Sequence, residues 1–157
     1  MYDIKIIPIG KVNTNINKNK LKDIGKEKNI SKLIIFEDYI ECLEGIEEFS
    51  HIIVCYWAHL VSMKQREIKK VHPKSNPKFP EVGIFSTHSQ VRPNPICLTI
   101  SEVLKREENV LFVKNLDAFN ESPILDIKPY IPFLDKTIDI SVPEWINKIR
   151  KTQSNSI

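Results

Sequence analysis

The scarcity of glycine constrains this chain more than any other feature of its sequence. The four glycines stand at positions 10, 25, 45 and 83. Neither G-x-G-x-x-G nor G-x-x-x-x-G-K-[ST] can be written from these positions, so the chain lacks the turns that bring backbone against a phosphate. A doubly wound sheet of the dinucleotide-binding type is therefore excluded.

Short apolar runs between prolines indicate a β-rich fold instead. The chain has ten prolines, and its most apolar run, residues 51–59, is rich in β-branched and aromatic side chains, which predicts a central strand. Strands are expected at residues 4–9, 32–36, 51–59, 82–85, 96–104 and 110–116, the last two as a hairpin. With no repeat or linker in 157 residues, we expect a mainly β, single-domain barrel with short helices.

Two helical segments and two loops complete the expected organisation. Residues 37–48 hold six acids and no base, with apolar side chains at helical spacing, which predicts a short amphipathic helix. A capping box at Ser141 to Glu144 predicts a C-terminal helix over residues 143–151 and a frayed tail over 152–157. The Asn- and Lys-rich residues 11–31 and the basic residues 64–78 are expected to be solvated loops.

Charge and cysteine content set the class of protein. The formal net charge is only +3, so any polyanion must bind a local patch. Cys42, Cys55 and Cys97 form no C-x-x-C pair and are expected to be reduced thiols of a cytoplasmic protein. No apolar run approaches the roughly 20 residues of a membrane helix, and no signal-peptide core is visible, so neither membrane insertion nor secretion is expected.

The segment Arg92-Pro93-Asn94-Pro95-Ile96 is preset by its prolines. Each proline fixes its own φ angle and pushes the preceding residue, Arg92 or Asn94, into an extended conformation. Such rigidity suits a binding loop, because side chains that are already held lose less entropy when a ligand arrives. A stiff structural turn is an equally good interpretation of the pattern.

The segment from Leu125 to Pro132 places Asp126, Lys128 and Tyr130 on one side of an extended chain. These groups could orient a substrate, abstract a proton or hold a cation. An ordinary surface ion pair between Asp126 and Lys128 is slightly favoured by the pattern alone.

Four histidines, His51, His59, His72 and His88, raise the question of a metal. No H-E-x-x-H or paired Cys/His spacing accompanies them, so no metal site is expected. His51 and His59 are eight residues apart and therefore lie on the same side of an extended strand. Either both face a pocket, or they are hydrogen-bonded histidines at the two ends of the strand. Nucleophilic hydrolysis has little support, since G-x-S-x-G and a Cys-His signature are absent.

Four ordered motifs give the chain a family resemblance. They are Ile9-Gly10-Lys11-Val12, Leu43-Glu44-Gly45-Ile46-Glu47-Glu48-Phe49-Ser50-His51, Arg92-Pro93-Asn94-Pro95-Ile96 and Leu125-Asp126-Ile127-Lys128-Pro129-Tyr130-Ile131-Pro132. In this order, across about residues 6–132, they resemble the TsaA-like (YaeB-like, TrmO-type) family, and the whole chain, 1–157, is expected to be one such domain. The resemblance implies a homodimeric β-barrel that uses S-adenosyl-L-methionine to methylate N6 of threonylcarbamoyladenosine beside the tRNA anticodon.

The resemblance also implies the positions of a cofactor site. It places cofactor contacts at His59, Leu60, His88, Leu98 and the turn Asn120-Glu121-Ser122-Pro123. No metal is required, because methyl transfer depends mainly on proximity and orientation.

The predicted catalytic residues follow from the need to remove a proton from the attacking nitrogen. Asp126 or Tyr130 is the expected acceptor, and Lys128 is expected to bind phosphate or steady a developing charge. Arg92 and Asn94, preset by the prolines, complete the predicted catalytic set.

The chain departs from the family pattern at several positions. His88-Ser89-Gln90 stands in place of Arg-Ser-Pro, Cys97 in place of a glycine, and Glu121 in place of the glycine of Asp-Gly-Thr-Pro. These departures leave open an alternative, a module that binds S-adenosyl-L-methionine or RNA without methyl transfer. A metal hydrolase rests only on the scattered histidines. The basic residues 64–78 and the early loop are expected to hold the tRNA backbone.

Overall fold

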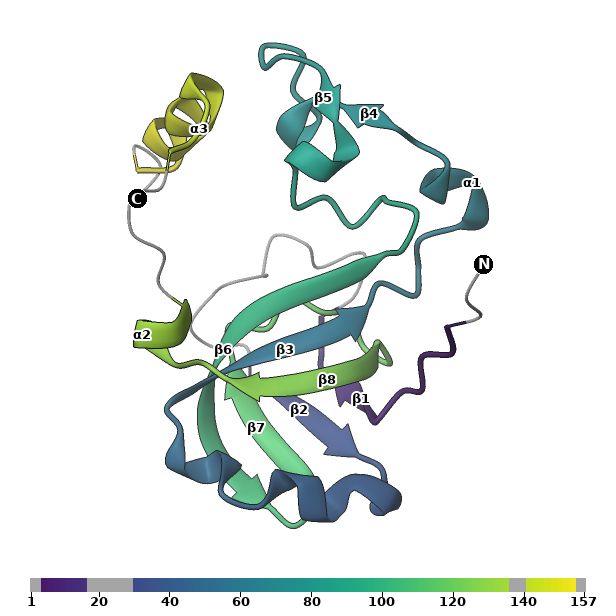
Figure 1. The fold of residues 1–157 in the computed structure, drawn as a ribbon, viewed down its shortest axis with the longest axis vertical. Helices are drawn as coiled ribbons and strands as arrows, with labels where there is room; N and C mark the ends of the chain where they lie inside the picture. Colours follow the sequence, from purple (N-terminus) through teal and green to yellow (C-terminus); the bar gives the residue numbers. More distant parts are fainter. Residues whose placement is uncertain (1–3, 17–29, 136–140, 155–157) are drawn as a thin grey trace.

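The computed structural model describes residues 4–16, 30–135 and 141–154 (Figure 1). Six strands close into an antiparallel barrel in the order β1-β2-β7-β6-β3-β8. They are β1 (Gly10–Asn13), β2 (Ile30–Ile35), β3 (His51–Trp57), β6 (Ile96–Glu107), β7 (Val110–Lys114) and β8 (Pro123–Pro129). The predicted mainly β barrel with short helices is therefore confirmed.

The connection between β3 and β6 forms a separate layer above the barrel in Figure 1. We call residues 58–95 the β3–β6 connection. Its two short strands, β4 (Lys70–Val71) and β5 (Val82–Gly83), pair with each other rather than with the barrel. Its helical turns are α1 (Met63–Arg66), η4 (Pro73–Ser75) and η5 (Ile84–Ser86).

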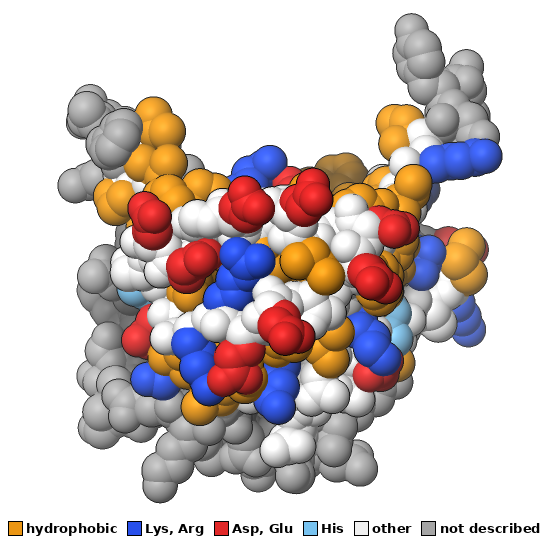
Figure 2. Space-filling model, turned by 90° about the horizontal axis from the view of Figure 1, so that it is seen from below, with side chains coloured by type: hydrophobic (Ala, Val, Ile, Leu, Met, Phe, Trp, Pro, Cys, Tyr) orange, Lys and Arg blue, Asp and Glu red, His pale blue; other side chains and the backbone are white. Residues whose placement is uncertain are grey.

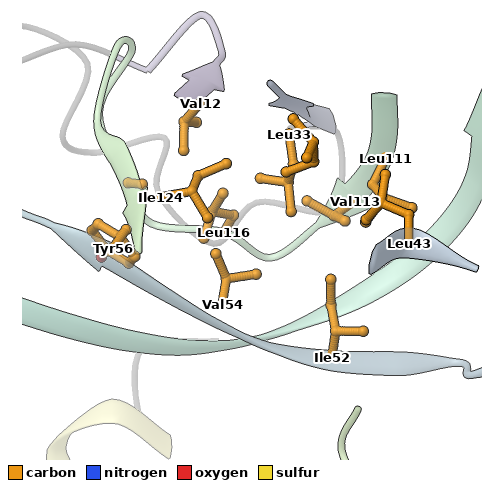
Figure 3. Packing of buried hydrophobic residues seen from close by; sticks show 12 residues of the cluster. Val12, Leu33, Leu43, Ile52, Val54, Tyr56, Leu111, Val113, Leu116 and Ile124 are labelled. Carbon is orange, nitrogen blue, oxygen red and sulfur yellow. The ribbon is translucent and has the colours of Figure 1, made fainter. Parts of the chain in front are cut away.

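The barrel interior is filled by side chains that alternate along the strands. Ile52, Val54 and Tyr56 of β3 are buried, whereas the residues between them are only partly so. In Figure 3 the labelled side chains from β1, β2, β3, β7 and β8 point toward one another, and Leu43 covers one end. This period of two explains why residues 51–57 form a strand.

Gly10 is required where β1 meets β2. A Cβ atom at this position would lie 3.0 Å from Cα of Ile35 and even closer to the carbonyl oxygen of Ile34. The absent side chain therefore permits the close pairing of Gly10 with Ile35 that starts the barrel.

The N-terminal predictions need correction. The expected strand at 4–9 is wrong, because residues 4–9 form no strand and Ile4, Ile6 and Ile7 are exposed. The chain meets the barrel at Ile9, whose backbone donates to Ile124 (2.8 Å) and accepts from Phe36 (2.9 Å), and it becomes a strand at Gly10. The expected loop 11–31 is therefore replaced by strand at Lys11–Asn13 and again from Ile30. Residues 17–29 of that expected loop lie outside the described part of the chain.

The other predicted elements agree with the structure in part. The helix expected at 37–48 consists of two 3-10 helices, η2 (Glu37–Leu43) and η3 (Ile46–Glu48), because Gly45 adopts a left-handed φ of 79° between them. The strand expected at 82–85 is only Val82–Gly83, followed by η5. The basic residues 64–78 are mostly loop but include α1, β4 and η4.

Among the residues that the structure describes, two helices follow the barrel. They are α2 (Pro132–Asp135) and α3 (Glu144–Ser154). The predicted C-terminal helix is confirmed, and it runs to Ser154 instead of residue 151. Residues 155–157 of the expected frayed tail lie outside the described part of the chain.

The end of the barrel that carries η2 and η3 has a mixed charge. Figure 2 shows this face, where Asp and Glu side chains are spread across the surface with Lys and Arg side chains between them. Arg106 crosses this end, donating to the carbonyl oxygens of Leu43 (3.1 Å) and Glu108 (2.9 Å). A polyanion therefore finds no continuous positive surface here.

Candidate functional site

A pocket opens at the end of the barrel where β3 finishes and β6 begins, beneath the β3–β6 connection. We call it the mouth pocket. Its volume of about 530 Å³ lies within the range of small-molecule sites. It is lined by Tyr56, His88, Ser89, Gln90, Val91, Arg92, Ile96, Cys97, Leu98, Asp117 and Phe119.

A carboxylate and two hydroxyl groups form a network in the mouth pocket. The buried Tyr56 hydroxyl donates to Oδ1 of Asp117 at 2.9 Å, and the Thr99 hydroxyl donates to the same oxygen. Burial raises the pKa of Tyr56 far above its usual range, and the negative charge of Asp117 raises it further. Tyr56 is therefore a neutral donor, and Asp117 provides the negative charge.

Cys97 adds a neutral thiol to the same wall. It pairs with Tyr56 across β3 and β6, and burial raises the pKa of its thiol. A thiol with a raised pKa is a weak nucleophile at neutral pH. The mouth pocket is thus suited to binding and proton transfer and not to thiolate chemistry.

Arg92 holds the segment that closes the mouth pocket. Its Nε donates to the carbonyl oxygen of Ser89 at 2.8 Å, and its Nη2 donates to those of Thr87 (2.5 Å) and Ile84 (3.5 Å). Arg92 lies in a bend of the chain, and its guanidinium reaches back over residues 84–89. Arg92 therefore lines the pocket and also fixes its wall.

The predicted cofactor contacts fall into two neighbouring groups. His88 and Leu98 both line the mouth pocket. His59 Nδ1 lies 3.3 Å from the hydroxyl of Ser122, which joins the end of β3 to the turn before β8. Phe119 lines the pocket and immediately precedes that turn. It therefore links the contacts that line the mouth pocket to those at the turn from Asn120 to Pro123.

The turn from Asn120 to Pro123 is fixed by its neighbours in the barrel. Asn120 Oδ1 accepts from the Thr14 backbone at 3.0 Å, and Glu121 pairs with Lys11 at 3.0 Å. Glu121 occupies the position where the family pattern has glycine, and its φ of 64° lies in the left-handed region. The turn thus keeps the conformation that favours glycine while presenting a carboxylate.

Three predicted catalytic residues lie outside the mouth pocket. Asp126 and Lys128 form an ion pair of 2.8 Å on the outer face of β8, with both side chains largely exposed, and the Tyr130 backbone donates to the carbonyl oxygen of His51. The Asp126 carboxylate and its hydrogen bond raise the pKa of Lys128. Asp126 and Lys128 thus form the surface ion pair that the sequence pattern slightly favours. Neither of them, nor Tyr130, lines the mouth pocket.

Asn94 and Leu60 are also not part of the pocket lining. Asn94 is exposed and its carbonyl oxygen accepts from Ile96, as in a tight turn. Leu60 is 40% exposed after the end of β3. Pro95 is buried, and its carbonyl oxygen accepts a hydrogen bond from the Ala58 backbone. At Asn94 the motif is therefore a stiff structural turn, one of the two interpretations that the sequence left open.

A second cavity adjoins the mouth pocket. We call it the upper cavity. Its volume is about 860 Å³, and it lies between the β3–β6 connection and α3. It shares His88, Ser89 and Val91 with the mouth pocket, and Trp145 and Lys74 are on its other walls. Residues 88–91 therefore separate two concave sites.

Sequence reasoning missed Tyr56, Thr99 and Asp117. Tyr56 and Thr99 stand on separate strands, and Asp117 follows a third, so no local spacing relates them. Tyr56 and Thr99 give only the signal of a polar side chain at an inward-facing strand position, and Asp117, in the loop after β7, gives none. The histidines do not gather: His51 lies at the opposite end of β3 from His59 and contacts Ser50. Within the described residues, no three His, Cys, Asp or Glu side chains form a group that could hold a metal ion.

Comparison with known proteins decides the family. Residues 18–136 match the model of the tRNA-methyltransferase O N-terminal domain. The chain belongs to the tRNA-methyltransferase O family. This confirms the resemblance carried by the four motifs.

Relatives of the family agree with this assignment. A probable S-adenosyl-L-methionine-binding protein of Methanocaldococcus jannaschii is 40% identical over 73% of this chain and 94% of its own length. The mouse tRNA (adenine(37)-N6)-methyltransferase is 34% identical over 74% of this chain but only 26% of its own length. The names of these relatives agree with the predicted cofactor and enzyme class.

A solved structure of TrmO shares the fold. It superposes with a TM-score of 0.73 at 24% identity, covering 90% of this chain and 64% of that chain. The chain thus spans less than two thirds of the TrmO structure and about a quarter of the mouse enzyme. Of the helices that the structure describes here, none has the length and apolar character to cross a membrane.

Proposed function

We propose that this chain transfers a methyl group from S-adenosyl-L-methionine to N6 of the adenosine beside the tRNA anticodon, and that the preferred adenosine carries a threonylcarbamoyl group. The observation that carries the proposal is the mouth pocket, where His88 and Leu98, two positions that the family resemblance assigns to the cofactor, share a wall with Tyr56 and Asp117. The names of the archaeal and mammalian relatives support both the cofactor and the substrate.

The residues of the mouth pocket fit S-adenosyl-L-methionine chemically. Leu98, Ile96 and Phe119 offer apolar surface for a purine ring, while Ser89 and Gln90 offer hydrogen-bonding groups. When bound, the cofactor would supply an electrophilic methyl group. The chain itself would hold and orient the reactants, because Arg92 fixes the segment 84–89 before they arrive.

Exposed lysines of the β3–β6 connection are placed to meet RNA. Residues 64–78 carry six Lys or Arg against one Glu, and the lysines at 64, 69, 70, 74 and 78 are exposed. Arg66 stacks on Trp57 with its guanidinium carbon 5.1 Å from the ring centre. Such a patch binds phosphates, whereas an unstacked anticodon base can enter a pocket.

The upper cavity supports the modified base as the preferred substrate. It shares a wall with the mouth pocket and carries His72 and Lys74, groups able to pair with the carboxylate of a threonylcarbamoyl substituent. A base that meets the cofactor at the edge of the mouth pocket could therefore extend its substituent past residues 88–91 into the upper cavity.

Methyl transfer to defined tRNA tests the proposal. Purified protein is incubated with radiolabelled S-adenosyl-L-methionine and tRNA with or without threonylcarbamoyladenosine, and cofactor binding is measured by calorimetry. We expect label on the modified tRNA and little on the unmodified tRNA. Cofactor binding without label on either tRNA would favour a binding module, the activity named for the archaeal relatives.

The proposal includes a cytoplasmic homodimer. Leu98 and Ile100 on the outer face of β6 are 68% and 49% exposed, and neighbouring Cys55 and Ile53 pair with them across β3. An apolar stripe of this kind suits self-association. Light scattering should give twice the mass of the 18.2 kDa chain, and a monomer at assay concentration would remove this part of the proposal.

A further inference from the structure

The acceptor for the departing N6 proton must lie within reach of the reacting nitrogen. Asp126 does not line the mouth pocket: it pairs with Cys55, which in turn pairs with Leu98. Two strand spacings, roughly 10 Å, therefore separate Asp126 from the pocket-lining Leu98. Its carboxylate is also engaged by Lys128 at 2.8 Å. Another base is needed.

Asp117 is the carboxylate in the lining of the mouth pocket. Its Oδ1 accepts from both Tyr56 and Thr99, whereas Oδ2 accepts no hydrogen bond from any of the described residues. The carboxylate is therefore held through one oxygen and presents the other. Tyr56 and Cys97 remain protonated, since burial raises the pKa of both groups, so neither is a competing base.

We propose that Asp117 is a catalytic residue whose Oδ2 accepts the N6–H of the target adenine and takes its proton. This inference rests on the proposed function. The lone pair of N6 forms the new bond to the methyl carbon, the electron pair of the carbon–sulfur bond stays on sulfur, and the N6 proton passes to Oδ2. Charge is conserved, because the positive sulfonium and the carboxylate both become neutral.

Tyr56 and Thr99 act as positioning residues for this carboxylate. Tyr56 is 5% exposed and stands on β3, and Thr99 stands on the adjacent β6, paired with Val54. Both donors are thus set by the barrel and not by a loop. A carboxylate whose hydrogen-bond donors stand on rigid strands needs little reorganisation as the proton moves.

Comparison of Asp117→Asn with Thr99→Val separates the carboxylate from its supports. D117N keeps an oxygen for Tyr56 and Thr99 but cannot take a proton, so we expect methyl transfer to fall by about 10²- to 10⁴-fold. T99V keeps the carboxylate and loses one hydrogen bond, for a loss of up to about 10-fold. Affinity for S-adenosyl-L-methionine, measured by calorimetry, should stay within about 3-fold in both variants, because neither change removes a cofactor contact in this scheme.

A binding measurement tests the same contact without turnover. An anticodon stem-loop RNA carries either adenosine or purine riboside, which lacks the 6-amino group, at the target position. Without cofactor, wild-type protein should bind the adenosine RNA about 10-fold more tightly, the effect of one hydrogen bond to a charged group. D117N should reduce that preference, because its anchored amide turns an N–H toward the pocket.

Each contrary result has a distinct meaning. Wild-type rates in D117N, or an unchanged preference for adenosine, would overturn the role of Asp117 and leave the proposed function standing. A cofactor affinity weakened more than about 10-fold by D117N would show that the carboxylate holds the cofactor instead. A larger loss in His88→Gln than in D117N would make the imidazole the acceptor. Cofactor binding with no transfer by wild-type protein would remove the proposed function and this inference with it.

Discussion

The barrel and the β3–β6 connection are held together by different forces. In the barrel, Val12, Leu33, Ile52, Val54 and Leu111 are fully buried side chains that pack across the interior. The connection has two-residue strands and short turns, and side-chain hydrogen bonds to backbone fix it, above all those of Arg92. Function is expected where a rigid scaffold carries an adaptable loop, and the mouth pocket lies at that boundary.

Removing packing should hurt the barrel far more than the connection. Ile52→Ala empties a position that is 0% exposed, and we expect the free energy of unfolding to fall by about 2–5 kcal/mol. An exposed control in the connection is Phe85→Ala at an 81% exposed side chain, with an expected change within about 0.5 kcal/mol. Urea unfolding measures both, and a loss in F85A comparable to that in I52A would contradict the exposed position of Phe85.

Adding a methyl group should show the same contrast. Gly10→Ala forces a Cβ against Ile34 and Ile35, so a loss of about 1–3 kcal/mol in unfolding free energy is expected. Gly83, at the start of η5, has a φ of −58°, and a Cβ added to it would meet no atom within 4 Å. Gly83→Ala should therefore be neutral or stabilise by up to about 1 kcal/mol. Thermal unfolding of the two variants checks the difference, and a destabilised G83A would contradict it.

Two arginines at opposite ends of the molecule allow a matched test of the site. Arg92→Lys keeps the positive charge but loses the planar fork that reaches Ser89 and Thr87. We expect cofactor affinity to fall about 10-fold, because the pocket wall loosens. Arg106→Lys removes a similar clamp on Leu43 at the far end and should leave cofactor affinity unchanged. Calorimetry on both variants decides, and equal effects would mean that Arg92 acts only through global stability.

Alkaline pH should lower the free energy of unfolding through Tyr56, which stands where the barrel meets the β3–β6 connection. Its pKa is raised in the folded protein by burial and by Asp117, so the folded state keeps the proton that the unfolded state loses above about pH 10. Stability from this group is complete below pH 10 and declines above it, by up to about 1.4 kcal/mol per pH unit. Tyr56→Phe should remove that part of the decline. Parallel unfolding curves for both proteins between pH 9 and 11 would contradict the shift.

The barrel was largely predictable because its strands carry strong local patterns. Residues 32–36, 51–59, 96–104 and 110–116 are apolar runs with β-branched side chains, and each overlaps a barrel strand. The N-terminal pattern misled, since the apolar residues 4–9 form no strand, although Ile9 packs against the core, whereas the polar Lys11–Asn13 lies in β1. Only Val12 of that strand points inward, and pairing with β2 and β8 supplies the rest.

The candidate site was predictable only where one segment builds it. The two prolines that follow Arg92 pointed to a rigid segment, and Arg92 does line the pocket. The group of Tyr56, Thr99 and Asp117 joins residues 18 to 61 positions apart. The barrel closure that brings them together depends on strand order, which no local pattern specifies.

The smallest effect is expected on the outer face of β8, where the predicted catalytic pair stands. Asp126 and Lys128 are joined by an ion pair whose side chains are 48% and 70% exposed, and water competes for such charges. Asp126→Asn and Lys128→Met should therefore leave the melting temperature, the cofactor affinity and the rate of methyl transfer close to wild type, in contrast to D117N. The segment is extended and its polar groups share one side, as the sequence predicts. That side faces away from the mouth pocket, and Asp126 lies two strands from the pocket-lining Leu98. A loss of transfer in D126N as large as that in D117N would return proton removal to β8 and require the substrate to lie on the outer face of the barrel.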